Sequence, residues 1–157
     1  MTDLAVVCVK WGTKYSAGYV NRLGSMVARH LSKPHEFICL TDAPAFLECR
    51  SLALPDGIEG WWNKLWVFSD AMATVARKIL MLDVDVVSTG SLDPLTESQA
   101  PLSLTVDWMR PRYYNGACYL LEVGALSHVW RLFEERGRQV NHYGDQEWIT
   151  EVVRPAF

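Results

Sequence analysis

Two aspartates, Asp83 and Asp85, follow the apolar run Lys78–Leu82 and are separated by a single residue. Such a run predicts a buried strand, and in open α/β sheets ligands bind beyond the carboxyl ends of the strands. Two carboxylates in this position can share a hard divalent cation such as Mg²⁺ or Mn²⁺, which takes oxygen ligands. The tripeptide is short and common, so the pair equally suits a strand end that caps a turn.

Aromatic and basic side chains elsewhere could complete such a site. Tyr15 offers a flat face to a nucleotide base, a stack worth about 1–3 kcal/mol, or it packs as a core aromatic. Lys64 can neutralise a phosphate oxygen as a point charge, or it is a solvated surface lysine. Trp61 and Trp62 have faces that suit sugar rings, but large apolar side chains are more often buried, so we expect both in the core.

Composition limits the classes of protein that fit. The 157 residues are 50% hydrophobic, which predicts one folded domain over residues 1–157. The formal net charge of -3 argues against nucleic acid as the main partner, because binding a phosphate backbone needs clustered basic charge. We expect no transmembrane segment, since no stretch approaches the roughly 20 apolar residues that span a bilayer.

The four cysteines show neither a CxxC pair nor a zinc-like spacing with histidine. Most of them lie in apolar runs, which predicts buried free thiols. The N-terminus lacks the basic start of a secretory signal. We therefore expect a soluble protein of the reducing cytoplasm.

The elements that must position these side chains alternate between strands and helices. Strands are predicted at Leu4–Val9, Phe37–Leu40, Ser51–Leu54, Lys78–Leu82, Leu102–Val106 and Ala117–Val123. Helices are predicted at Tyr19–Leu31, at Leu65–Ala76 with Asn63 as N-cap, at Ala125–Arg136 and from about Asp145, with a loop over Gly90–Pro94. The first strand, helix and strand predict a βαβ unit, hence an α/β fold whose mostly parallel central sheet is flanked by helices.

Five blocks, taken in order, resemble the GT-A (Rossmann-like) glycosyltransferases, especially the family-8 group that includes glycogenin and bacterial lipopolysaccharide galactosyltransferases. The blocks are Tyr15–Gly18, Asn63–Leu65 with Trp66, Lys78–Asp85, Asn115–Ala117 and Gly144–Gln146, and the resemblance runs from residue 4 to about residue 150. It implies a metal-dependent glycosyltransferase that moves a hexosyl group from a UDP-sugar to a hydroxyl acceptor, with retention of configuration.

The resemblance also implies a role for each matching residue. Metal binding (Mn²⁺ or Mg²⁺) falls to Asp83 and Asp85, nucleotide binding to Tyr15, Lys64 and Val84, the donor-sugar pocket to Asn115 and Gly116, and catalysis beside the reacting carbon to Asp145 and Gln146. From the residues alone, Asn115 also suits a turn, and Asp145 suits a helix N-cap, a role compatible with the functional one.

One departure from the family pattern concerns histidine. The family's metal-binding histidine follows the Gly-Asp-Gln block, whereas here His142 precedes it and no histidine follows Gln146. The family's C-terminal region is also missing, so we expect slow donor hydrolysis to exceed transfer to simple sugars unless a second subunit of a homo-oligomer or another partner completes the site. A non-catalytic nucleotide-sugar-binding module and a partner-binding scaffold on a truncated GT-A fold remain alternatives.

Overall fold

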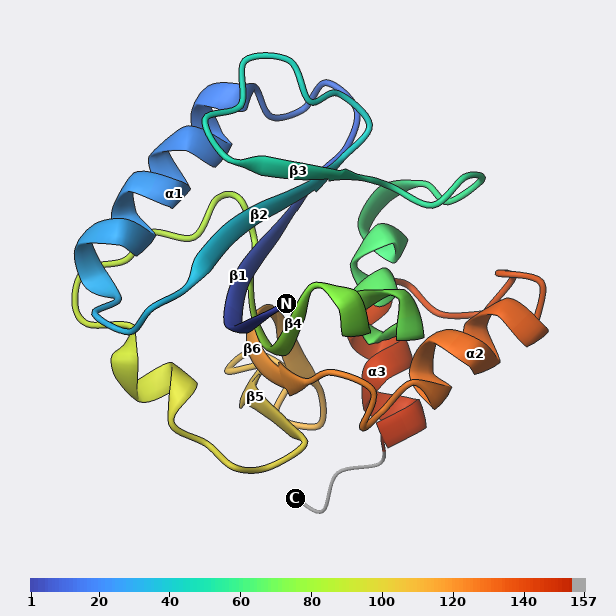
Figure 1. Ribbon diagram of the computed structural model, residues 1–157. Helices are drawn as coiled ribbons and strands as arrows, with labels where there is room; N and C mark the ends of the chain where they lie inside the picture. The colour runs from blue at the N-terminus through green and yellow to red at the C-terminus, as the bar shows by residue number, and fades with distance from the viewer. Residues whose placement is uncertain (154–157) are drawn as a thin grey trace.

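The computed structural model describes residues 1–153, and over this range the chain forms one six-stranded sheet with helices on both faces (Figure 1). The strand order is β3-β2-β1-β4-β6-β5. The strands are β1 (Thr2–Lys10), β2 (Glu36–Thr41), β3 (Arg50–Ala53), β4 (Ala76–Leu82), β5 (Leu102–Val106) and β6 (Tyr114–Glu122). The helices are α1 (Ala17–His30), α2 (His128–Glu135) and α3 (Asp145–Val153), with 3₁₀ helices η1 (Gly60–Phe68), η2 (Asp70–Thr74) and η3 (Asp93–Thr96).

The predicted βαβ unit is confirmed by β1, α1 and β2. The two strands are parallel, with Val7 opposite Ile38, and β1 also pairs in parallel with β4 on its other side. Strand β3 extends the parallel part of the sheet beside β2. The carboxyl ends of these four strands therefore meet at one edge of the sheet, where ligands bind in α/β folds.

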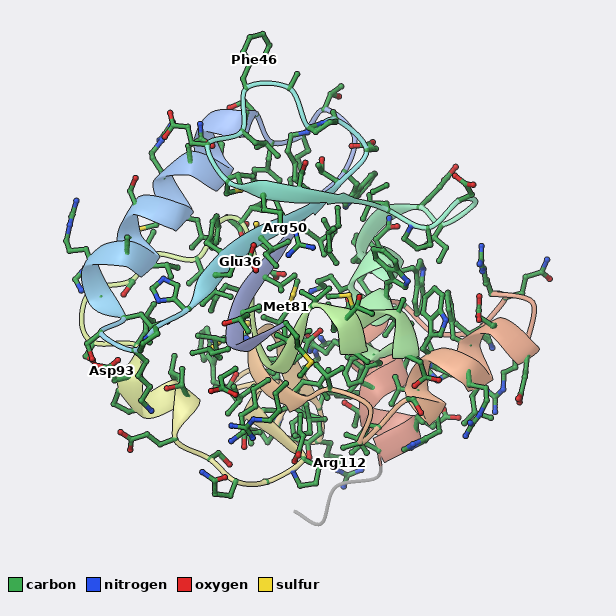
Figure 2. All side chains as sticks on the ribbon, viewed as in Figure 1. Glu36, Phe46, Arg50, Met81, Asp93 and Arg112 are labelled. Atoms are coloured by element: carbon green, nitrogen blue, oxygen red, sulfur yellow. The ribbon has the colours of Figure 1, made fainter. Side chains whose placement is uncertain are left out.

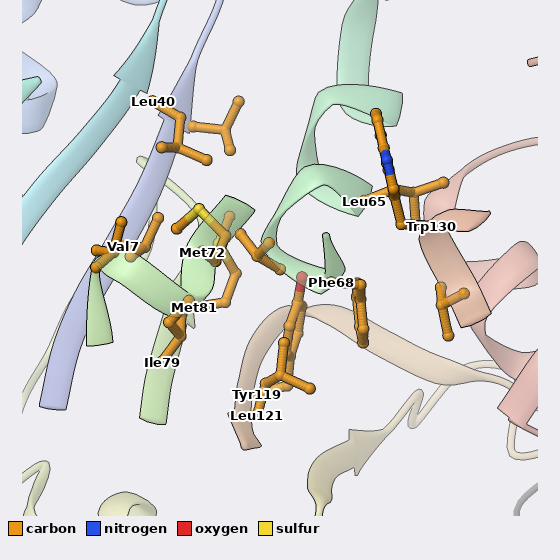
Figure 3. Packing of buried hydrophobic residues seen from close by; sticks show 14 of the residues in the cluster. Val7, Leu40, Leu65, Phe68, Met72, Ile79, Met81, Tyr119, Leu121 and Trp130 are labelled. Carbon is orange, nitrogen blue, oxygen red and sulfur yellow. The ribbon is translucent and has the colours of Figure 1, made fainter. Parts of the chain in front are cut away.

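The two faces of β1 carry two separate cores, because alternate residues of a strand point to opposite sides. Ala5 and Val7 belong to the first core, which packs against η1, α2 and α3. Leu4 and Val6 belong to the second core, which packs against α1. Figure 3 shows part of the first core, in which Phe68 of η1 lies beside Tyr119 of β6. Coverage on both faces explains why the strands read as continuous apolar runs.

Strand β6 reverses direction, since it pairs antiparallel with both β4 and β5. Its first residues therefore lie at the edge where β1 and β4 end. The register along β6 is interrupted: Leu104 pairs with Tyr119, whereas the next residue, Thr105, pairs with Asn115. The intervening residues of β6 bulge out of the β5–β6 ladder, and bulges commonly re-aim side chains next to functional sites.

The helix predicted over Leu65–Ala76 is wrong. Two 3₁₀ helices occupy the region, η1 and η2, and Ala76 already begins β4. Ser69 adopts an extended conformation between them and interrupts the turn pattern. Asn63 is not an N-cap but lies inside η1, where its side-chain amide donates to the carbonyls of Ile58 and Gly60.

Other predicted boundaries of helices and loops differ from the observed ones by a few residues. The helix predicted over Ala125–Arg136 is shorter, because a turn precedes His128, and the loop predicted over Gly90–Pro94 gives way to η3 at Asp93.

The β2–β3 connection carries Phe46 at its exposed tip, while Glu36 and Arg50 form an ion pair across the two strands at 3.2 Å (Figure 2).

The cysteines and the lengths of the helices were also predicted from the sequence. All four cysteines are free thiols. Cys8 and Cys39 are buried as predicted, whereas Cys118, which also lies in an apolar run, is only half-buried. Within residues 1–153, every helix is too short or too polar to cross a membrane.

Candidate functional site

A pocket of about 310 Å³ opens at the carboxyl ends of β1 and β4. Its lining consists of Val9, Trp11, Lys14, Tyr15, Trp61, Lys64, Asp83, Val84 and Asp85. Five of the sequence-predicted site residues thus line one cavity: Tyr15, Lys64, Asp83, Val84 and Asp85. The others, which come from β6 and α3, are joined to this pocket by Lys64.

Lys64 lies in η1 and is only 8% exposed, so the alternative of a solvated surface lysine is wrong. Its ammonium lies 3.1 Å from Asp83 Oδ1 and 3.0 Å from Asp145 Oδ2. It also donates to the carbonyl oxygen of Gly116 at 3.3 Å. Burial opposes the charge of this ammonium, but the two carboxylates outweigh that effect, and the pKa of Lys64 lies above its ordinary value.

Asp145 is the first residue of α3, so it lies one position inside the helix rather than at its N-cap. Its carboxylate faces Lys64 and is almost fully buried. Burial raises the pKa of the Asp145 carboxyl; Lys64 opposes the rise, Asp83 adds to it, and the pKa stays above its ordinary value. A negative charge in the first turn is also favourable for the helix dipole.

Gly116 and Gln146 join β6 to α3 beside this ion pair. The Gly116 N–H donates to Gln146 Oε1 at 3.3 Å. A Cβ atom on Gly116 would lie 3.0 Å from Asp145 Oδ2 and 3.3 Å from Lys64 Nζ. Only glycine therefore allows the buried ion pair to approach the backbone of β6 this closely.

Asp107 is a member of this cluster that the sequence analysis missed. Its Oδ2 accepts a hydrogen bond from Gln146 Nε2 at 2.9 Å and pairs with Arg110 Nε at 3.0 Å. Arg110 in turn reaches Glu147 of α3 at 2.6 Å. A usable signal was present, because Asp107 follows the predicted strand Leu102–Val106 just as Asp83 follows β4, and both strands end at the same edge of the sheet.

Asn115 lies in β6, not in a turn, where the register of that strand is interrupted. Its Oδ1 accepts a hydrogen bond from the Ala117 N–H at 2.8 Å, which satisfies a backbone donor within the bulge. The Ala117 carbonyl accepts from the Asp83 N–H at 2.9 Å. Asn115 thus supports the local backbone that connects β6 to the start of the Asp-x-Asp segment.

Tyr15 and Asp85 make direct contact at the other side of the pocket. The Tyr15 hydroxyl donates to Asp85 Oδ2 at 2.6 Å. The tyrosine ring is half-buried against the second core. Its centroid lies 5.0 Å from that of the Tyr19 ring, which meets it edge-on, and 4.8 Å from the Lys14 ammonium. Its two predicted roles are therefore compatible: the ring packs on the core and also lines the pocket. Val84, between the aspartates, is buried in the second core and lines the pocket too.

Trp61 and Trp62, adjacent in the sequence, differ in burial. Trp62 packs in the first core and stacks on Phe133, as predicted, but the prediction that Trp61 is core is wrong. Trp61 is 45% exposed, lines the pocket and stacks on Tyr143. Trp11, which follows β1, lines the same pocket and was not predicted from the sequence.

The carboxylates of Asp83 and Asp85 fit a hard divalent cation, because both offer oxygen atoms to one pocket. Among residues 1–153 no group of three or more His, Cys, Asp or Glu side chains could hold a metal ion. His142 instead contacts Glu151 at 2.6 Å and the edge of Trp148. The described part of the chain would supply two ligands, and water oxygens suit the remaining positions.

Solved structures of the galactosyltransferase LgtC resemble this chain. LgtC in complex with donor and acceptor sugar analogues aligns with a TM-score of 0.65 and 16% sequence identity, over 93% of this chain and 69% of that chain. An active-site mutant of LgtC aligns with a TM-score of 0.64 and 15% identity over the same shares. No protein-family model and no curated protein sequence matches. Over residues 1–153 the chain has the GT-A-like fold of LgtC, with a mixed, mostly parallel six-stranded sheet flanked by helices.

Proposed function

We propose that the chain is a metal-dependent glycosyltransferase with a UDP-sugar as donor and a hydroxyl group as acceptor. The observation that carries the proposal is the continuity of the site: Lys64 contacts Asp83 in the pocket and Asp145 beside β6 with one ammonium group. The LgtC structure that contains donor and acceptor sugar analogues adds support through its fold.

The nucleotide half of the site comprises Tyr15, Val84 and the two aspartates of the Asp-x-Asp segment. The ring of Tyr15 stacks on the base, and Val84 packs beside it. Asp83 and Asp85 hold Mn²⁺ or Mg²⁺, which stabilises negative charge on the departing diphosphate. Lys64 provides a fixed positive charge next to the oxygens of the departing diphosphate. Fixed charges in a pocket that excludes much of the water stabilise developing charge better than solvent does.

The sugar half of the site comprises Asn115, Gly116, Asp145 and Gln146. The Asp145 carboxylate accepts hydrogen bonds from sugar hydroxyls, with Lys64 balancing its charge. Gln146 is held between the Gly116 N–H and the Asp107 carboxylate, so its amide has a fixed orientation. In the proposal this amide lies beside the reacting sugar. Positioning of this kind is a large part of rate enhancement in group transfer. We further propose that residues 1–157 act as one nucleotide-sugar-binding domain.

The binding step is tested by calorimetry with UDP in Mn²⁺ and in excess chelator, using the wild type, Asp85→Asn and a control, Asp70→Asn. Asp70 is an exposed aspartate that does not line the pocket. We expect UDP to bind much more weakly after chelation and in Asp85→Asn, because either change removes a bridge to the diphosphate. Equal UDP affinity under all conditions would contradict the metal site.

The chemical step is tested by UDP release from UDP-glucose and UDP-galactose with Mn²⁺, with and without sugar acceptors. Gln146→Ala should lower turnover while UDP affinity stays nearly unchanged, because Gln146 acts on the sugar half. Metal-dependent UDP binding by the wild type without turnover would favour the non-catalytic module. Absence of UDP binding would favour the partner-binding scaffold.

A further inference from the structure

Tyr15 contributes to two proposed positions of the nucleotide half, the one for the base and the one for the metal. Its ring lines the pocket, and its hydroxyl donates to Asp85 Oδ2 at 2.6 Å. A hydrogen bond from a hydroxyl to an ionised carboxylate is roughly twice as strong as one between neutral groups. Within residues 1–153 no other group donates a hydrogen bond to Asp85. The orientation of this carboxylate therefore depends on Tyr15.

The two aspartates are held in different ways. Lys64 Nζ lies 3.1 Å from Asp83 Oδ1 and 3.4 Å from Oδ2, so the ammonium contacts both oxygens of that carboxylate. Tyr15 bonds only Oδ2 of Asp85 and leaves Oδ1 available. A carboxylate has about four acceptor positions, so one hydroxyl bond is compatible with a bound cation. Asp85 is thus the more available metal ligand of the two, and the Tyr15 hydroxyl sets its direction.

Tyr15 itself is held on its other sides. Its ring packs partly on the second core and meets the edge of Tyr19 at 5.0 Å between centroids. Lys14 is exposed, so a base can displace its ammonium from the Tyr15 ring. A base stacked on this ring would restrict it further, and restriction of the ring restricts the hydroxyl that orients Asp85.

We propose that Tyr15 couples nucleotide and metal binding, with the ring holding the base and the hydroxyl orienting Asp85 for the cation. The inference rests on the proposed function, because it assumes that UDP and a divalent cation occupy the pocket. Each ligand then raises the affinity of the other, as reciprocity of binding free energies requires. Tyr15 is in this sense a positioning residue for the metal as well as a contact for the base.

The experiment measures Mn²⁺ binding from the spin-resonance signal of free Mn²⁺, without nucleotide, with uridine and with UDP. Uridine carries the base but no phosphate, so an effect of uridine on Mn²⁺ affinity cannot come from a diphosphate that bridges to the cation. The variants are Tyr15→Phe, which keeps the ring and removes the hydroxyl, and Tyr19→Phe, a matched control whose hydroxyl makes no hydrogen bond among the described residues.

We expect Tyr15→Phe to bind Mn²⁺ about 10–100-fold more weakly than the wild type, the usual cost of losing a group that orients a metal ligand. Uridine should tighten Mn²⁺ binding in the wild type and in Tyr19→Phe but not in Tyr15→Phe. Wild-type Mn²⁺ affinity in Tyr15→Phe, or no effect of uridine on the wild type, would overturn the coupling while leaving the metal site intact. Failure of the wild type to bind Mn²⁺ even with UDP would overturn the proposed metal site, and the coupling with it.

Discussion

At the scale of single residues, Lys64 is the centre of the candidate site. Its ammonium has two carboxylate partners and a carbonyl partner, which come from the end of β4, from α3 and from β6. An ion pair this deeply buried contributes little net stability compared with an apolar replacement of both partners. Removal of one partner alone is costly, because it leaves the other charge buried without compensation.

Lys64→Met should therefore lower the free energy of unfolding by about 3–5 kcal/mol, because the Asp145 carboxylate loses its counter-ion. Lys64 lowers the pKa of Asp145, so the variant raises that pKa further above its ordinary value. The folded variant then binds a proton more readily than the unfolded chain. Its loss of stability should be greatest at neutral pH and shrink as the pH falls toward the pKa of Asp145.

Urea unfolding at neutral and mildly acidic pH measures this effect. Lys14→Met is the control, since Lys14 is exposed at the same pocket. The double variant Lys64→Met with Asp145→Asn should recover much of the lost stability at neutral pH, because it has no buried unpaired carboxylate. A loss in Lys64→Met that is the same at both pH values and is not recovered in the double variant would argue against this account.

Residue types could be predicted from the sequence better than residue environments. The carboxylates Asp83 and Asp85 were identifiable because they follow an apolar run, and the structure brings both to one pocket. The burial of Lys64 was not identifiable, since a lysine between a polar residue and an apolar one, as here between Asn63 and Leu65, fits either a surface or an interior position. Which carboxylates it would meet depends on β6 and α3, which are distant in the sequence.

At the scale of elements, strands were predicted better than the region before β4. Parallel strands buried on both faces give continuous apolar runs, which are easy to recognise. The spacing of Leu65, Phe68, Met72 and Val75 resembles a helix, and all four are core residues. The first three lie in the 3₁₀ helices η1 and η2, and Val75 directly follows η2. The apolar spacing identified the buried residues correctly but predicted one continuous helix in place of two 3₁₀ helices, because tertiary packing overrides weak helix propensity. The interruption of β6 has no local signal apart from Gly116.

Strand β6 also carries a buried hydroxyl without a partner. Tyr119 is 1% exposed and packs against Phe68, and its hydroxyl has no hydrogen-bond partner within residues 1–153. Burial, with Asp145 and Asp83 nearby, raises the pKa of this phenol well above its ordinary value, so the hydroxyl stays neutral. Tyr119→Phe keeps the ring and removes the desolvated oxygen, which costs about 1–3 kcal/mol when left unsatisfied.

We expect Tyr119→Phe to be at least as stable as the wild type, with a gain of up to about 1–3 kcal/mol. Tyr119→Ala should instead lose about 3–5 kcal/mol through the cavity it leaves in the first core. Denaturant unfolding compares both with Tyr143→Phe, whose hydroxyl is exposed. A destabilised Tyr119→Phe would indicate that the hydroxyl has a partner in solution, such as a buried water.

At the scale of the whole molecule, the order of strands assembles the site. Because β6 runs against β4, its beginning meets the ends of β1 and β4, and β5 then brings Asp107 to the same edge. The sequence predicted the parallel half of this arrangement through the βαβ unit. It could not predict that β6 is antiparallel and lies beside β4, since pairing between distant segments depends on the complete fold.

A ligand in this pocket would bind the folded chain and not the unfolded one, so it should raise the melting temperature. At a concentration about 100 times its Kd, one ligand adds about 2.7 kcal/mol of stability. For a chain of this size each kcal/mol corresponds to roughly 2–4 °C, so UDP at that level with Mn²⁺ should raise Tm by about 5–11 °C.

Calorimetric scans with UDP alone, Mn²⁺ alone and both together test this directly. The joint shift should exceed the sum of the separate shifts, because the diphosphate and the aspartates share the cation. Chelator should reduce the joint shift to that of UDP alone. A joint shift no larger than the sum of the separate shifts would show that UDP and the cation bind independently.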